Sequence, residues 1–116
     1  MNAQHEFIQH IQSRQILCAE ITNGGPYDEN IKKFILTTGY SSIEFQKFLK
    51  SLDFEYDGGY GGQEIYGIIW YTDNTWSSRG EYDGSEWWEY NKCPEIPQHL
   101  NRIDKVRDKS INKIIQ

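Results

Sequence analysis

The chain has 116 residues, enough for one domain and too few for a second core. It contains 12 Lys and Arg and 17 Asp and Glu, which gives a net charge of −5. This charge argues against a nucleic-acid backbone as partner and favours basic partners. Hydrophobic residues make up 37% and aromatic residues 15%, which favours a folded chain over a disordered one. No apolar run could cross a bilayer and no secretory signal is visible, so we expect a cytoplasmic protein without membrane partners.

Acidic and aromatic side chains gather in the same part of the sequence. Residues 53–91 contain nine acidic side chains and one basic side chain, whereas residues 92–116 contain three acidic and six basic ones. The same middle segment holds 11 of the 17 aromatic residues. Negative charge and aromatic rings therefore coincide there, in the mixture that binding surfaces show.

The first forty residues predict a helix and two strands. Residues 3–14 place Phe7, Ile8 and Ile11 on one face of a short helix. Strands rich in β-branched and aromatic residues are expected over 16–22 and 31–38, with a loop between them.

A central helix is better specified. Ser41 and Glu44 form a capping box, and Tyr40 and Phe45 stand where a hydrophobic staple is found. Helical spacing of the apolar residues continues to Leu52, so this helix is expected to pack on a sheet.

The second half of the chain predicts a three-stranded antiparallel meander. A short strand at 54–56 and a loop with four glycines over 57–62 precede it. The meander strands are expected at 64–72, 75–82 and 85–92. Asp73-Asn74 and Asp83-Gly84 both suit two-residue hairpin turns.

Two-residue turns fix the register and therefore the two faces of the meander. Tyr71 is then opposite Trp76, Gly67 opposite Gly80, Arg79 opposite Trp88, and Glu81 opposite Glu86. One face is assigned to the core: Ile65, Ile69, Tyr71, Trp76, Tyr82 and Trp87, with Glu89 as its one charge. The other face is assigned to binding: Tyr66, Ile68, Trp70, Ser77, Arg79, Glu81, Glu86, Trp88 and Tyr90. A one-residue error at either turn would exchange parts of these sets.

The C-terminal stretch predicts a basic amphipathic helix over 98–116, after a compact core at 1–97 of the single domain. Apolar residues from Leu100 to Ile115 recur at roughly helical spacing, with five Lys and Arg between them. Such a helix either docks its apolar stripe on the domain or mediates association with a partner, including a homodimer.

The histidines and cysteines of the chain show none of the spacings typical of catalytic or metal sites. His5, His10 and His99 lack ligand spacing, and Cys18 and Cys93 belong to no Cys-x-x-Cys pair. Two widely spaced cysteines in a chain of this kind are expected to be reduced thiols. We therefore expect no metal, no cofactor and no catalytic residue.

Two further functions fit parts of the pattern. Glu81 and Glu86, opposite each other near Trp88, could raise one carboxyl pKa and act as the acid/base pair of a hydrolase. Alternatively, Tyr66, Trp70 and Trp88 could stack on a nucleotide or sugar while Arg79 recognises an anion.

Several short motifs resemble those of small phage and prophage open reading frames. They are residues 60–64, Gly67, 69–70, 75–76, 79–89 and 93–97, so the resemblance covers about the third quarter of the chain. It implies a genomic setting in which short acidic proteins disarm host defences, as anti-CRISPR proteins do, and it carries no catalytic residue to transfer.

The sequence therefore predicts an α+β inhibitor without enzymatic activity. Carboxylates displayed among aromatic rings on a stiff sheet could enter a basic groove built for nucleic acid and block a host defence nuclease as a nucleic-acid mimic. The predicted partner-binding residues are Tyr60, Glu64, Tyr66, Trp70, Arg79, Glu81, Asp83, Glu86, Trp88 and Tyr90.

Overall fold

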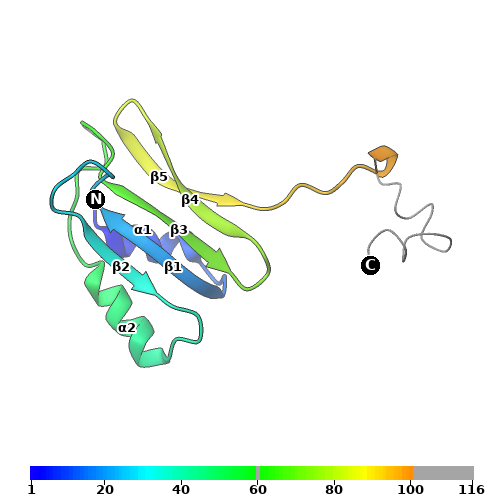
Figure 1. Cartoon of the computed structure of the whole chain (residues 1–116), viewed down its shortest axis with the longest axis horizontal. Helices are drawn as coiled ribbons and strands as arrows, with labels where there is room; N and C mark the ends of the chain where they lie inside the picture. Colours follow the sequence, from blue (N-terminus) through cyan, green and yellow to red (C-terminus); the bar gives the residue numbers. More distant parts are fainter. Residues whose placement is uncertain (60, 101–116) are drawn as a thin grey trace.

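The structure, a computed structural model, describes residues 1–59 and 61–100. Its elements are α1 (Ala3–Ile11), β1 (Ile16–Asn23), β2 (Lys32–Leu36), α2 (Ser42–Ser51), β3 (Ile65–Tyr71), β4 (Trp76–Tyr82), β5 (Ser85–Asn91) and the short 3-10 helix η1 (Gln98–Leu100). The strands form one antiparallel sheet in the order β2-β1-β3-β4-β5 (Figure 1). The expected α+β fold, with an N-terminal helix, a central helix and a meander, is confirmed. The predicted C-terminal helix lies, from residue 101 on, outside the described residues.

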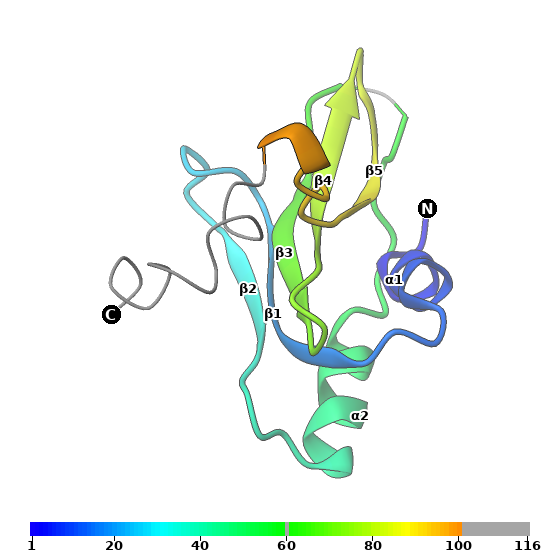
Figure 2. The ribbon, with the colours of Figure 1, turned by 90° about the vertical axis from the view of Figure 1, so that its right-hand side faces the viewer.

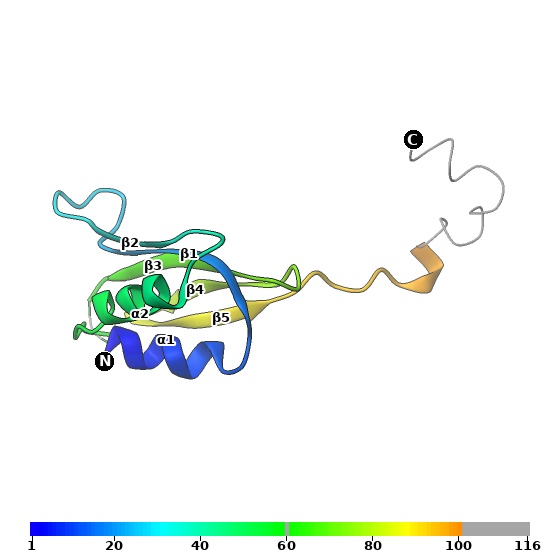
Figure 3. The same ribbon diagram turned by 90° about the horizontal axis from the view of Figure 1, so that it is seen from below.

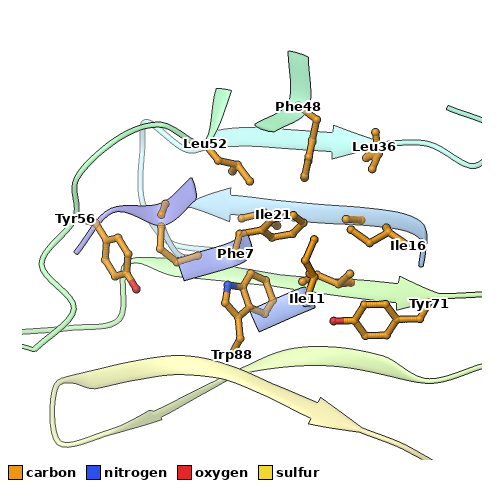
Figure 4. Close-up of a cluster of buried hydrophobic side chains, with 14 residues drawn as sticks. Phe7, Ile11, Ile16, Ile21, Leu36, Phe48, Leu52, Tyr56, Tyr71 and Trp88 are labelled. Carbon is orange, nitrogen blue, oxygen red and sulfur yellow. The ribbon is translucent and has the colours of Figure 1, made fainter. Parts of the chain in front are cut away.

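Both helices pack on one side of the sheet, which we call the inner face (Figures 2 and 3). The core lies between them and the strands, where the rings of Phe7 and Phe48 meet edge to face at 5.6 Å (Figure 4). The opposite side, the outer face, is covered by neither helix.

Helix α2 forms as its sequence predicts. Ser41 Oγ accepts from the Glu44 N–H, and the Glu44 carboxylate accepts from the Ser41 N–H, both at 3.1 Å. The rings of Tyr40 and Phe45 stack at 5.6 Å, as a staple requires. Phe48 is buried and directs the helix onto the core.

Helix α1 is shorter than expected and is rotated relative to the prediction. It ends at Ile11, because Gln12 adopts a φ of 53°, which a continuing helix does not allow. Ala3, Phe7 and Ile11 are buried, whereas Ile8 is 45% exposed, so placing Ile8 on the core side was wrong. The expected short strand at 54–56 does not join the sheet, since Glu55 bridges to Asn2 at the start of α1.

The hairpin of β4 and β5 has the predicted register. Arg79 is opposite Trp88 and Glu81 is opposite Glu86. The two turn residues have positive φ, 52° at Asp83 and 86° at Gly84, as a tight two-residue turn demands.

The hairpin of β3 and β4 is shifted by one residue. Trp70, and not Tyr71, is opposite Trp76, and Gly67 is not paired with Gly80. The Tyr71 N–H donates to the Thr75 carbonyl, so the loop has three residues, the last of them Asn74 with a φ of 67°. The Asp73 carboxylate accepts from the backbone N–H and the hydroxyl of Thr75, which favours this longer loop.

Because successive side chains of a strand alternate between its faces, the shift exchanges the two faces of β4 and β5 while β3 keeps its own. Every side chain of β4 and β5 therefore lies on the face opposite the predicted one. Trp76, Tyr82 and Trp87, assigned to the core, lie on the outer face. Arg79, Glu86 and Trp88, assigned to the binding face, turn inward. Trp88 is 8% exposed and Glu86 4%, so both belong to the interior.

Candidate functional site

The predicted partner-binding residues divide into three groups in the structure. Tyr66 and Trp70 lie on the outer face. Arg79, Glu86, Trp88 and Tyr90 lie on the inner face, although Tyr90 near the end of β5 keeps 38% of its surface exposed. Glu64, Glu81 and Asp83 lie at one end of the sheet, and Tyr60 is outside the described residues. One continuous surface therefore does not hold all of them.

Arg79 is the centre of a buried ion cluster beneath the hairpin. Its side chain is 2% exposed; its Nη2 donates to Glu86 Oε1 at 2.7 Å, and its Nη1 lies 3.1 Å from Glu6 Oε2. The Tyr56 hydroxyl accepts from Nη2 at 3.1 Å and donates to Glu6 Oε1 at 2.5 Å. The only basic residue of the acidic segment 53–91 is thus neutralised in the interior.

Glu86 also ties β5 to the start of β3. Its Oε2 accepts from the Glu64 N–H at 2.8 Å and its Oε1 from the Ile65 N–H at 2.9 Å. Both carboxylate oxygens are therefore occupied and shielded from water. Glu86 cannot reach a substrate, so its pairing with exposed Glu81 does not form an acid/base dyad.

The electrostatics of the cluster favour the charged form of Arg79. Burial acts to lower the pKa of Arg79, but the Glu6 charge and the hydrogen bonds that Arg79 donates to Glu86 and Tyr56 outweigh it and raise that pKa. Burial and the hydrogen bond to Glu6 raise the pKa of Tyr56. Arg79 therefore stays charged and the Tyr56 hydroxyl stays protonated near neutral pH.

A hydrogen-bonded chain missed by the sequence reasoning runs beside this cluster. His10 Nε2 lies 2.6 Å from Ser77 Oγ, which lies 2.7 Å from the Tyr71 hydroxyl. Burial, followed by the charges of Arg14 and Arg79, lowers the pKa of His10, which favours neutral imidazole. Ser77 is fully buried, so it is no accessible nucleophile. The pattern Asp73-x-Thr75 was the sequence signal for this chain of hydrogen bonds. It favours the three-residue loop, and the register that follows from that loop turns Ser77 toward the inner face.

The outer face carries an exposed aromatic and aliphatic patch across the sheet. Its exposed side chains come from β2 to β5: Ile35, Ile68, Trp70, Tyr82 and Trp87. Tyr66 and Trp76, on the same face, are half-buried. Trp70 is 40% exposed and Trp87 36%. The Trp87 Nε1 donates to Glu89 Oε1 at 2.9 Å, and both groups lie over Gly80, where an added Cβ would approach them to within 2.8 Å. The glycine therefore makes room for the ring.

Carboxylates gather where the hairpin tip meets the glycine-rich loop, and we call these residues the acidic end: Asp57, Glu64, Glu81 and Asp83. The loop and the hairpin touch, since the Glu86 N–H donates to the Gly58 carbonyl at 3.3 Å. Glu64 and Glu81 accept from the backbone N–H groups of Asp57 and Gly84. Within the described residues none of the four pairs with a cation, so the end keeps its negative charge.

A hollow of about 510 Å³ adjoins the acidic end. Polar residues line it, among them Asp28, Lys32, Gln63 and Glu64. No three ligating side chains converge on a metal position in the part of the chain that the structure describes. The predicted stacking pocket is not formed either, because Tyr66 and Trp70 are separated by the sheet from Trp88 and Arg79.

Comparisons with protein-family models, curated proteins and solved structures find no match to this chain. None of the helices within residues 1–59 and 61–100 has the length and apolar character needed to span a membrane.

Proposed function

We propose that this chain is a binding protein without enzymatic activity that blocks a basic, nucleic-acid-handling host protein. The contact surface is the outer face of β3 to β5 together with the adjoining acidic end. The observation that carries the proposal is that exposed rings lie next to a group of carboxylates on the same part of the surface. Within the described residues, none of these carboxylates forms an ion pair. The resemblance to phage proteins favours a defence nuclease as the target class.

Each part of this surface has a distinct physical role. Carboxylates at the acidic end steer a positively charged groove toward the protein and form charge-assisted hydrogen bonds with Arg and Lys. Exposed rings such as Trp70 and Trp87 stack on guanidinium groups and bury apolar area, which prolongs the complex. Charge therefore sets the association rate and the rings set the dissociation rate.

The geometry supports this surface in preference to the two alternatives. A hydrolase built on Glu81 and Glu86 needs an accessible Glu86, whose carboxylate is enclosed by Arg79 and two backbone N–H groups. A small-ligand pocket needs Trp70 and Trp88 on one side of the sheet, and they lie on opposite sides.

A displacement assay with purified nucleases tests the proposal. The chain is added to a panel of nucleases that have basic grooves and are guided by DNA or RNA, each with a fluorescently labelled duplex bound. Release of the duplex is followed by the fluorescence anisotropy of its label. We expect release by at least one nuclease, with an association rate that falls as salt rises. No release from any of them would contradict the proposed function.

Two sets of variants separate charge from rings. Asp57→Asn, Glu81→Gln and Asp83→Asn together should slow association and remove its salt dependence, while Trp70→Ala should mainly speed dissociation. The charge-matched control is Glu95→Gln with Asp104→Asn and Asp108→Asn, three acidic residues that follow the sheet in the sequence. If the control variant and the acidic-end variant slow association equally, the net charge of the protein, and not this surface, determines the association rate.

A further inference from the structure

Glu89 of β5 is an exposed carboxylate that lies among the aromatic side chains of the outer face. The predicted register placed it on the core side, and the shift between β3 and β4 turns it outward together with Trp87. Glu89 lies two residues along the strand from Trp87 and opposite Ser78 of β4. Neither helix covers this face (Figures 2 and 3). A negative group therefore lies within the patch of rings, separate from the acidic end.

The Glu89 carboxylate is held in one position by its neighbours. Trp87 Nε1 donates to Glu89 Oε1 at 2.9 Å. Both groups lie over Gly80, where an added Cβ would come within 2.6 Å of Glu89 Oε1 and 2.7 Å of Trp87 Nε1. Glu89 Oε2 has no hydrogen-bond partner among the described residues. The carboxylate is therefore oriented before a partner arrives, and one of its oxygens is open to a donor.

The strands of the described chain present one other carboxylate on the outer face, and that one has a cation. Glu20 of β1 lies opposite Ile35 and Ile68, and Lys33 Nζ lies 3.9 Å from its Oε1. No ion pair in the part of the chain that the structure describes involves Glu89. The charge of Glu89 is thus the one on this face that is left for a cation from outside.

We propose that Glu89 binds an arginine side chain of the partner, and that this contact makes the outer face prefer arginine to lysine. The contact rests on the proposed function, since it takes the outer face as the contact surface. It adds a specificity-determining residue and the side chain that this residue recognises.

A guanidinium fits this position better than an ammonium. It is planar, it offers two parallel N–H groups to one carboxylate, and it stacks on aromatic rings. At Glu89 it has two indole rings within reach. Trp87 is on the same strand, and Trp76 is the diagonal neighbour of Glu89 across the ladder between β4 and β5. The ammonium of lysine is compact and strongly hydrated, so it gains less from the rings.

Two peptides of equal charge test the preference on the full chain. Acetylated hexaarginine and acetylated hexalysine are each titrated into the protein, and binding is followed by tryptophan fluorescence and by the indole N–H resonances in NMR spectra. We expect hexaarginine to bind on the order of tenfold more tightly than hexalysine, and to shift the indole resonance of Trp87. Equal affinities, or binding of neither peptide, overturn the proposal.

Two variants that lose the same charge locate the contact at Glu89. Glu89→Gln keeps an amide oxygen that can accept from Trp87, whereas Glu20→Gln removes the carboxylate of the same face that already has Lys33. We expect Glu89→Gln to abolish the preference for arginine and Glu20→Gln to keep it. A preference that persists in Glu89→Gln, or that both variants lose, overturns the assignment to Glu89.

Gly80→Ala tests the position of the carboxylate and changes no charge. The added Cβ meets the ends of two side chains, Glu89 and Trp87, which can turn aside, so we expect the variant to fold. Hexaarginine should bind several-fold less tightly because the carboxylate is displaced. Trp87→Phe, which keeps a ring and removes the N–H, has the same expected outcome. Unchanged affinity in both variants, with a folded domain by circular dichroism, overturns the role of this orientation.

The arginine contact and the proposed function can fail independently. Preference for hexaarginine that depends on Glu89, without release of a duplex from any nuclease, contradicts the proposed function and leaves the arginine site standing. Release of the duplex that is equally effective with the parent chain and with Glu89→Gln overturns the arginine contact and leaves the proposed function standing.

Discussion

Arg79 Nη2 lies 2.7 Å from Glu86 Oε1 beneath the hairpin, and the two side chains are 2% and 0% exposed. The arginine comes from β4 and the glutamate from β5, and Glu6 of α1 completes the charge balance from a third element. The ion cluster therefore fixes the hairpin against both the start of β3 and the N-terminal helix. Its members stabilise the domain and are unavailable to a partner.

Removing Arg79 should cost stability. Arg79→Met leaves the buried carboxylate of Glu86 and the partly buried one of Glu6 without their cation, and breaking a buried pair in this way costs about 3–5 kcal/mol. Urea unfolding followed by circular dichroism measures the change in the free energy of unfolding. Glu81→Gln, at an exposed position of the same strand, is the control and should stay within about 0.5 kcal/mol of the parent. A similar small loss for Arg79→Met would show that the cluster is dispensable.

Stability should depend on pH through His10. Its pKa lies below the ordinary 6.5 in the folded state, so around and below pH 6.5 the unfolded chain binds more protons. The contribution of neutral His10 is fully present above pH 6.5 and is lost as pH falls through the folded pKa. His10→Gln keeps a polar side chain beside Ser77 and removes the titration. The difference in unfolding free energy between parent and variant should shrink as pH falls; a difference independent of pH would exclude this role.

Gly67 should not tolerate a side chain. Its φ is +152°, and an added Cβ would lie 2.5 Å from the Glu20 carbonyl oxygen and 2.9 Å from Ile21 Cα, both backbone atoms of β1. The backbone of β1 cannot move aside easily, so Gly67→Ala should lose about 1–3 kcal/mol or more. Gly62→Ala, where nothing lies within 4 Å, is the matched control. Thermal melts of the two variants check the prediction, and equal melting temperatures would refute it.

The loop between β3 and β4 should discriminate between residues at position 74. Asn74 has a φ of 67°, which asparagine and glycine adopt more readily than alanine. Asn74→Ala should lower the free energy of unfolding by about 1 kcal/mol, and Asn74→Gly should change it little. Chemical denaturation of both variants gives the comparison. If alanine is as stable as glycine, the loop has another conformation and the register of β4 needs revision.

Local sequence signals predicted the elements whose determinants lie within a few residues. Ser41 and Glu44 start α2 because each satisfies the other's backbone N–H, and Asp83-Gly84 sets the β4–β5 register because both residues accept positive φ. The turn at Asp73 was predicted one residue too short, since Asp73-Asn74 alone suits a two-residue turn. Thr75, through its bonds to Asp73, selects the three-residue loop.

By itself the sequence determined an α+β chain with a helix over a meander, an acidic aromatic segment, and the acidic residues at the hairpin tip. Only the tertiary structure decided which rings are exposed and that Arg79, Glu86 and Trp88 are interior. The physical reason is the two-residue period of a strand, through which one extra loop residue moves every following side chain to the other face. The partners of Arg79 are equally long-range, since Glu6 lies on the first helix and meets it only when the domain is assembled.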